Sequence, residues 1–239
     1  MNTYNDVSGE SECKATYSTL HDVTSKSESD YNVDSYAETR EIQQDRRGLN
    51  MSLGLITVTP NAVYVAADSR TTNTVYNGDN SIAQQTHNDN YQKIVIHKPT
   101  CKVVISTGTN EFNGLSLKQL VESNDDIEKI KKELRAYRTN TRIVWYSDMN
   151  YPQIDTLFDR FVGRNLNYIL GNDAAVDMIK PIPPFSGHND NDAIAYINSI
   201  FTLCIANPIP FNNTIGGKIH ILKLEPEKAP FWIQGEYNL

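Results

Sequence analysis

The segment Ser52–Thr72, SLGLITVTPNAVYVAADSRTT, places the tightest constraint on the fold. Its two apolar, β-branched runs, Leu53–Val58 and Ala62–Ala67, flank the turn pair Pro60-Asn61, which is typical of a β-hairpin. The second run ends abruptly in Asp68-Ser69-Arg70. Polar and charged side chains directly after a buried strand cost free energy unless they are paired or used. The sequence therefore predicts a buried hairpin whose polar end is paired or functional.

Length, charge and cysteine content restrict the classes of function. The 239 residues suffice for one domain with a substantial core. A net charge of −7, with no stripe of Lys and Arg, argues against a nucleic-acid partner or an anionic membrane surface. The N-terminus has no apolar signal region, no run reaches membrane-spanning length, and Cys13, Cys101 and Cys204 are scattered. We therefore expect a soluble, cytoplasmic protein that binds neither nucleic acid nor membrane.

Residues 1–50 differ in composition from the rest of the chain. They are rich in Ser, Asp, Glu, Asn, Thr and Tyr and contain few aliphatic residues. Such a segment buries too little apolar surface to offset the entropy lost on ordering. We interpret it as a polar extension, a disordered tail or a propeptide, in which a short helix around Tyr36–Arg46 is an option. The globular domain is predicted to span residues 51–239.

Hairpins and helices alternate in runs along this domain. Thr71–Asn90 is polar and is predicted to be a loop. The other expected elements are strands Lys93–His97 and Lys102–Thr107, helices Leu115–Val121 and Ile127–Tyr137, strand Arg142–Tyr146, helix Ile154–Phe161, strands Leu166–Leu170 and Val176–Ile182, helix Ala193–Ala206 capped by Asp190 or Asn191, and the hairpin Lys218–Leu224 with Phe231–Ile233. This order indicates an α+β fold in which two sheets pack face to face, with helices outside each.

Three segments, taken in order, resemble the proteasome-type N-terminal nucleophile (Ntn) hydrolase family. They are AVYVAADSRTT at Ala62–Thr72, YQKIVIHKPTCKVVISTGT at Tyr91–Thr109, and NNTIGGKIHILKL at Asn212–Leu224. The middle of the chain, residues 110–190, resembles the family poorly. The resemblance implies a four-layer αββα sandwich of two mainly antiparallel sheets. It also implies a homo-oligomeric ring that acts on peptide or amide substrates without a cofactor, and it leaves the existence of an ATPase partner open.

In this family the first residue of the mature chain is the nucleophile, and its own α-amino group is the general base. A hydroxyl is a weak nucleophile at its free pKa, so a base must lie within hydrogen-bond reach. An α-amino group, with a pKa of about 7.7–8.0, supplies one at physiological pH. The resemblance assigns Asp68 and Lys93 to the catalytic pair, in which the Lys cation keeps the amine neutral. It assigns Gly108 to the oxyanion site. It also places Ser106 at the substrate site. Supporting residues around the site are Arg70, Ser186 and Asn212. Asn212 stands where the family usually has Asp.

The position of the nucleophile depends on the alignment of the first hairpin. An alignment without a gap from Asp68 backward places Ser52 there. Matching Leu53-Gly54 to the equivalent pair of many family members places Asn50 there instead, which describes an inactive subunit. We favour Ser52, because it carries a hydroxyl and follows Met51. The chain is therefore expected to be a serine-type Ntn peptidase or amidohydrolase, with a catalytically silent, proteasome-like structural subunit as the alternative.

The tetrapeptide His-Asn-Asp-Asn occurs twice, at His87–Asn90 and His188–Asn191. Two His and two Asp side chains are suitable ligands for a catalytic metal ion, which makes a metal-dependent hydrolase a remote alternative. Both copies have the composition of polar turns. We therefore predict no metal site.

Overall fold

The computed structural model describes residues 52–78, 82–137, 139–147, 150–157, 160–162, 167–171, 173–187, 189–207 and 214–235. Two five-stranded sheets and one two-stranded hairpin make up the β structure of these residues. All strand pairs within them are antiparallel. The α+β class with mainly antiparallel sheets is therefore confirmed. Residues 1–51, which include Asn50 and the Tyr36–Arg46 segment, lie outside the described part.

The first sheet carries the predicted opening hairpin at its centre. Its strand order is β10-β1-β2-β11-β12. The strands are β1 (Leu53–Val58), β2 (Val63–Asp68), β10 (Asn167–Gly171), β11 (Ile219–Leu224) and β12 (Phe231–Gln234). Every residue of β1 and β2 is buried. The uninterrupted apolar runs that predicted this hairpin therefore reflect a sheet that is covered on both faces.

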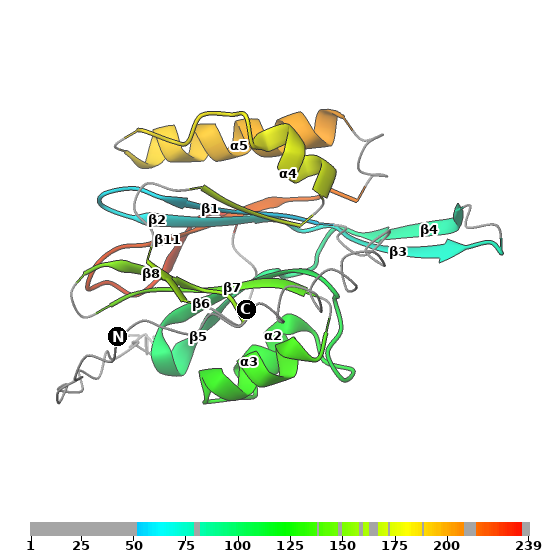
Figure 1. Cartoon of the computed structure of the whole chain (residues 1–239), viewed down its shortest axis with the longest axis horizontal. Helices are drawn as coiled ribbons and strands as arrows, with labels where there is room; N and C mark the ends of the chain where they lie inside the picture. Colours follow the sequence, from blue (N-terminus) through cyan, green and yellow to red (C-terminus); the bar gives the residue numbers. More distant parts are fainter. Residues whose placement is uncertain are drawn as a thin grey trace, which may run out of the picture.

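The second sheet has the strand order β5-β6-β7-β8-β9. Its strands are β5 (Ile94–His97), β6 (Lys102–Gly108), β7 (Thr139–Tyr146), β8 (Pro152–Asp155) and β9 (Arg160–Val162), and a short 3-10 turn, η1 (Lys98–Thr100), joins β5 to β6. The helices are α2 (Leu117–Glu122), α3 (Ile127–Arg135), α4 (Asp173–Ile179) and α5 (Asp190–Ala206). Figure 1 shows α4 and α5 along the outer face of the first sheet, and α2 and α3 on the outer face of the second.

Apolar side chains fill the space between these elements in three clusters of the described residues. One cluster lies between the sheets and includes Val65 of β2 and Ile105 of β6. A second cluster joins the first sheet to α4 and α5, and it includes Leu55 of β1 and Phe201 of α5. The third packs Ile130 and its neighbours on α2 and α3 against the second sheet. This packing buries the C-terminal end of β2, where Asp68 lies.

Two predicted elements are wrong in type. Ile154–Phe161, expected as a helix, instead contains the end of β8 and the start of β9, because pairing with β7 buries all of β8 and outweighs the helical spacing of its apolar residues. Val176–Ile182, expected as a strand, lies largely in α4. There Ala175 and Ile179, one helical turn apart, are both buried against the first sheet, and this packing outweighs the β-branched composition.

Two further expectations need correction at their details. Thr71–Asn90 is not a loop, because β3 (Thr71–Tyr76) and β4 (Ile82–Asn88) form a hairpin within it. Backbone hydrogen bonds hold the two strands together, and these bonds do not depend on apolar side chains. The polar composition of the segment therefore did not reveal the hairpin. Figure 1 shows that it extends away from the stacked sheets. Helix α5 is capped by Asn189, whose side chain accepts from the backbone N–H of Asp192, and not by Asp190 or Asn191.

Candidate active site

Asp68 is the centre of a buried polar cluster. It ends β2 and has no exposed surface. Its Oδ1 accepts hydrogen bonds from Lys93 Nζ at 2.8 Å and from the backbone N–H of Leu53 at 2.9 Å. Its Oδ2 accepts from the backbone N–H of Gly216 at 3.0 Å. One buried carboxylate thus joins the first strand, the residue ahead of β5 and the loop that precedes β11, because each supplies a donor that must be satisfied away from water.

Lys93 is the cationic partner of Asp68. Its side chain is 1% exposed, and the residue directly precedes β5. Besides Asp68, its ammonium group donates to the backbone carbonyl of Arg70 at 2.5 Å. Burial lowers the pKa of Lys93 below its ordinary value, and the carboxylate of Asp68 opposes this effect. The ion pair is therefore a fully desolvated one, in which each charge depends on the other.

Ser52 lies next to this ion pair along the chain. It is 2% exposed and directly precedes the amide of Leu53 that binds Asp68. Gly171, at the end of β10, packs against the carbonyl group of Ser52. Gly171 has φ of 116°, and a Cβ atom there would lie 1.8 Å from the carbonyl oxygen of Ser52. The backbone of residue 52 is thus placed by a glycine that no side chain can replace without displacement.

Gly171→Ala is therefore expected to destabilise the protein by roughly 1–3 kcal/mol, through overpacking against Ser52 and an unfavourable φ. Urea denaturation would measure the change. Gly78→Ala is the matched control, since nothing lies within 4 Å of a Cβ atom at that position. We expect that control to stay within about 0.5 kcal/mol of the parent protein. Equal stabilities of the two variants would show that Gly171 does not constrain Ser52.

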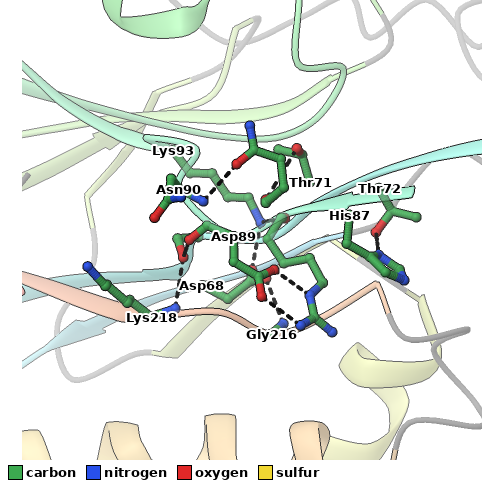
Figure 2. Close-up of polar contacts among 12 residues, drawn as sticks. Asp68, Thr71, Thr72, His87, Asp89, Asn90, Lys93, Gly216 and Lys218 are labelled. Carbon is green, nitrogen blue, oxygen red and sulfur yellow. Dashed lines mark hydrogen bonds and ion pairs between the residues drawn. The ribbon is translucent and has the colours of Figure 1, made fainter. Parts of the chain in front are cut away.

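Arg70 and Asp89 border the cluster at the base of the β3–β4 hairpin. Arg70 Nε and Nη2 donate to the two carboxylate oxygens of Asp89 at 2.6 and 2.8 Å (Figure 2). Ser69 Oγ donates to the backbone carbonyl of Asp89 and accepts from the backbone N–H of Lys218 at 2.8 Å. The ion pair lowers the pKa of Asp89 through the hydrogen bond from Arg70. These contacts join the two ends of the hairpin to the chain around Asp68.

The other residues assigned from the sequence lie in different settings. Gly108 ends β6 with φ of 102°, a conformation that glycine adopts readily. Ser106 Oγ is hydrogen-bonded to Thr141 Oγ1 of β7 at 2.8 Å, and its backbone N–H donates to the carbonyl of Lys93. Ser186 is exposed in the loop before α5, and no contact described here joins it to the Asp68 cluster. Asn212 and Asn50 lie outside the described residues.

Sequence reasoning missed Gly171, Gly216 and Asp89. A glycine directly after the predicted strand Leu166–Leu170 is the signal that would have marked Gly171. Gly216 lies within the segment Asn212–Leu224, whose resemblance to the family assigns it no role. The His-Asn-Asp-Asn tetrapeptide marks Asp89 only as a possible metal ligand, and nothing in the sequence shows that the chain returns to Arg70 after the hairpin.

The described ranges contain neither a metal-binding cluster nor a membrane-spanning helix. No group of three or more His, Cys, Asp or Glu side chains there could hold a metal ion. No helix in the same ranges is long and apolar enough to cross a membrane.

Comparisons with known proteins give a likeness of fold. No family model matches the sequence, and no curated protein matches it. A solved structure of a Gly-1 mutant of Anbu from Hyphomicrobium sp. strain MC1 aligns with a TM-score of 0.51 at 15% identity, covering 77% of this chain and 88% of that one. A second Anbu structure from the same strain has a TM-score of 0.48 at 14% identity. The chain is thus similar to Anbu in fold.

Proposed function

We propose that this protein is a proteasome-like amide hydrolase whose nucleophile is Ser52 at a free N-terminus. The observation that carries the proposal is the buried Asp68–Lys93 ion pair, which is hydrogen-bonded to the amide directly after Ser52. Anbu, which has a similar fold, is a proteasome-like protein related to Ntn hydrolases. The resemblance of the three sequence segments points to the same chemistry. Peptides and other amides are the substrate class.

Each residue has a role in the proposed reaction. Ser52 Oγ attacks the carbonyl carbon of the substrate and passes its proton to the α-amino group of the same residue, which then protonates the leaving amine. Lys93 keeps that amino group neutral through its positive charge, and Asp68 holds Lys93 in place. Backbone N–H groups near Gly108 stabilise the oxyanion. Water then attacks the acyl-enzyme ester, which releases the acid product and restores Ser52.

We further propose that the packed sheets and their outer helices are the four-layer αββα sandwich of the Ntn hydrolases. The three apolar clusters, one between the sheets and one beneath each pair of helices, support this assignment. Proteasome-like proteins act as rings, so we propose a homo-oligomer as the functional form. A catalytically silent subunit of the same fold is the competing function, and the position of the free N-terminus distinguishes the two.

The test of the proposed function is the requirement for a free Ser52. With residues 1–51 attached, the nitrogen of Ser52 is an amide and cannot act as a base. Translation from Met51 followed by removal of that Met would expose it. We expect a form that begins at Ser52 to hydrolyse small peptide amides, and we expect the full chain to be inert. Release of a fluorescent amine from peptide substrates measures both.

The control is the same form with its N-terminus acetylated, which keeps every side chain but removes the base. We expect the acetylated form to lose activity. If the form with a free Ser52 is inert, the silent-subunit function replaces the catalytic one. Equal activity of the full chain and the processed form would exclude an α-amino base.

A further inference from the structure

The Arg70–Asp89 ion pair closes the base of the β3–β4 hairpin. Arg70 directly precedes β3, and Asp89 directly follows β4. The pair is bidentate, with Nε and Nη2 of Arg70 on the two carboxylate oxygens of Asp89. A bidentate guanidinium–carboxylate contact fixes the orientation of both partners as well as their distance. The pair therefore holds Arg70 in one orientation.

Arg70 in turn contacts Lys93 directly, and it is linked to Asp68 through Gly216. Its carbonyl oxygen accepts from Lys93 Nζ at 2.5 Å, and its N–H donates to the carbonyl of Gly216 at 3.1 Å. Its guanidinium lies so close to Gly216 that a Cβ atom there would be 2.6 Å from Cζ. The N–H of Gly216 is itself a donor to Asp68. A shift of Arg70 would thus move an acceptor of Lys93 and a donor to Asp68 together.

We propose that the Arg70–Asp89 ion pair positions Lys93 and Asp68 for catalysis. This inference rests on the proposed function. Asp89 does not contact Lys93 or Asp68 through any hydrogen bond described here, and it acts through Arg70. It is therefore a positioning residue and not a catalytic one. The same ion pair closes the base of the β3–β4 hairpin, so a displacement of that base would also displace the groups around Lys93.

The charges around Lys93 give the pair an electrostatic role as well. Asp68 and Asp89 favour the charged form of Lys93, and Arg70 disfavours it. Arg70, His87 and Lys93 face Asp89 as positive or titratable groups. Removal of the Asp89 charge leaves the Arg70 cation uncompensated near Lys93. The pKa of Lys93 should then fall further below its ordinary value.

Exposure separates a positioning role from a structural one. The side chains of Arg70 and Asp89 are 23% and 44% exposed, whereas those of Lys93 and Asp68 are 1% and 0% exposed. Partly exposed ion pairs contribute little to folding stability. Breaking the Arg70–Asp89 pair should therefore change the state of Lys93 with little change in the melting temperature.

The experiment follows the titration of Lys93 by NMR in the full chain labelled with ¹³C at lysine Cε. In Asp89→Asn we expect the Lys93 titration to move to lower pH. In Asp89→Glu, which keeps the carboxylate, we expect it to stay closer to that of the parent. Asp125→Asn is the charge-matched control, because Asp125 is exposed ahead of α3, and we expect no change there. In the form that begins at Ser52, Asp89→Asn should lower kcat on the order of tenfold to a hundredfold, with little change in KM.

Each result decides the inference. An unchanged Lys93 titration in folded Asp89→Asn would overturn it, as would a loss of activity that Asp89→Glu does not partly restore. If Asp89→Asn does not fold, Arg70→Lys takes its place. That variant keeps the charge and loses the bidentate geometry, and an unchanged Lys93 Cε resonance in it would overturn the inference. The NMR measurement needs no activity, so an inert parent with a shifted Lys93 would count against the proposed function and not against the positioning.

Discussion

Ser52→Ala is expected to lower kcat of the form that begins at residue 52 on the order of 10³-fold or more, since it removes the nucleophile and leaves only binding and oxyanion stabilisation. The change deletes one hydroxyl from a side chain that is buried beside β1. The backbone N–H of Leu53 still donates to Asp68, so the fold should persist. Steady-state hydrolysis of a peptide amide measures kcat, and urea denaturation measures the free energy of unfolding.

Ser199→Ala is the matched control for this variant. Ser199 lies on the exposed face of α5, where its hydroxyl donates to the carbonyl of Ala195 within the helix. We expect its kcat to equal that of the parent. The free energy of unfolding should change by about 1 kcal/mol or less in both variants. A Ser52→Ala protein that hydrolyses the substrate as fast as the parent would exclude Ser52 as the nucleophile.

Asp68→Asn is expected to destabilise the protein by about 3–5 kcal/mol, because it leaves the ammonium group of Lys93 buried without its counter-ion. Lys93 would keep the backbone carbonyl of Arg70 as an acceptor, which does not replace a charge. Activity should be lost as well, because Lys93 would no longer be held as a cation. Urea denaturation of parent and variant at neutral pH measures the effect.

The double variant Asp68→Asn/Lys93→Met is the control for the buried charge. It removes both charges while the Asn carbonyl still accepts from a backbone N–H. We expect it to be more stable than Asp68→Asn alone, because no uncompensated charge remains. The form of the variant that begins at Ser52 should nevertheless stay inactive. If Asp68→Asn costs less than about 1 kcal/mol, the two charges are not coupled in the way that the buried geometry requires.

Local sequence patterns correctly predicted the strands that are buried on both faces and joined by a short turn. The hairpin of β1 and β2 was predicted because apolar residues cover both of its faces and Pro60-Asn61 provides the turn. The same reasoning failed at β8 and at α4, where the apolar spacing fits either type of element. Pairing with β7 decided the first case, and packing against the first sheet decided the second.

The residues of the candidate site could be predicted from the sequence to different degrees. Asp68 stood out from sequence alone, because a charged residue that ends a buried strand needs a partner. The partner, Lys93, came from the resemblance to the Ntn hydrolases. Ser186, assigned from the same resemblance on a loose match, is exposed ahead of α5 and contributes no contact described here to the cluster. Short segments with strong local constraints were thus more informative than an isolated small residue in a loop.

The sequence by itself specified an α+β chain with a buried hairpin that ends in a carboxylate, because hydrophobic periodicity and the cost of burying charge act over a few neighbouring residues. It did not specify that Asp89 meets Arg70 or that Gly171 packs on Ser52, since those contacts join residues that are not neighbours in the sequence. Such contacts depend on strand order and register, which arise only when both sheets pack. Tertiary structure therefore decided which groups surround Lys93 and how Ser52 is held.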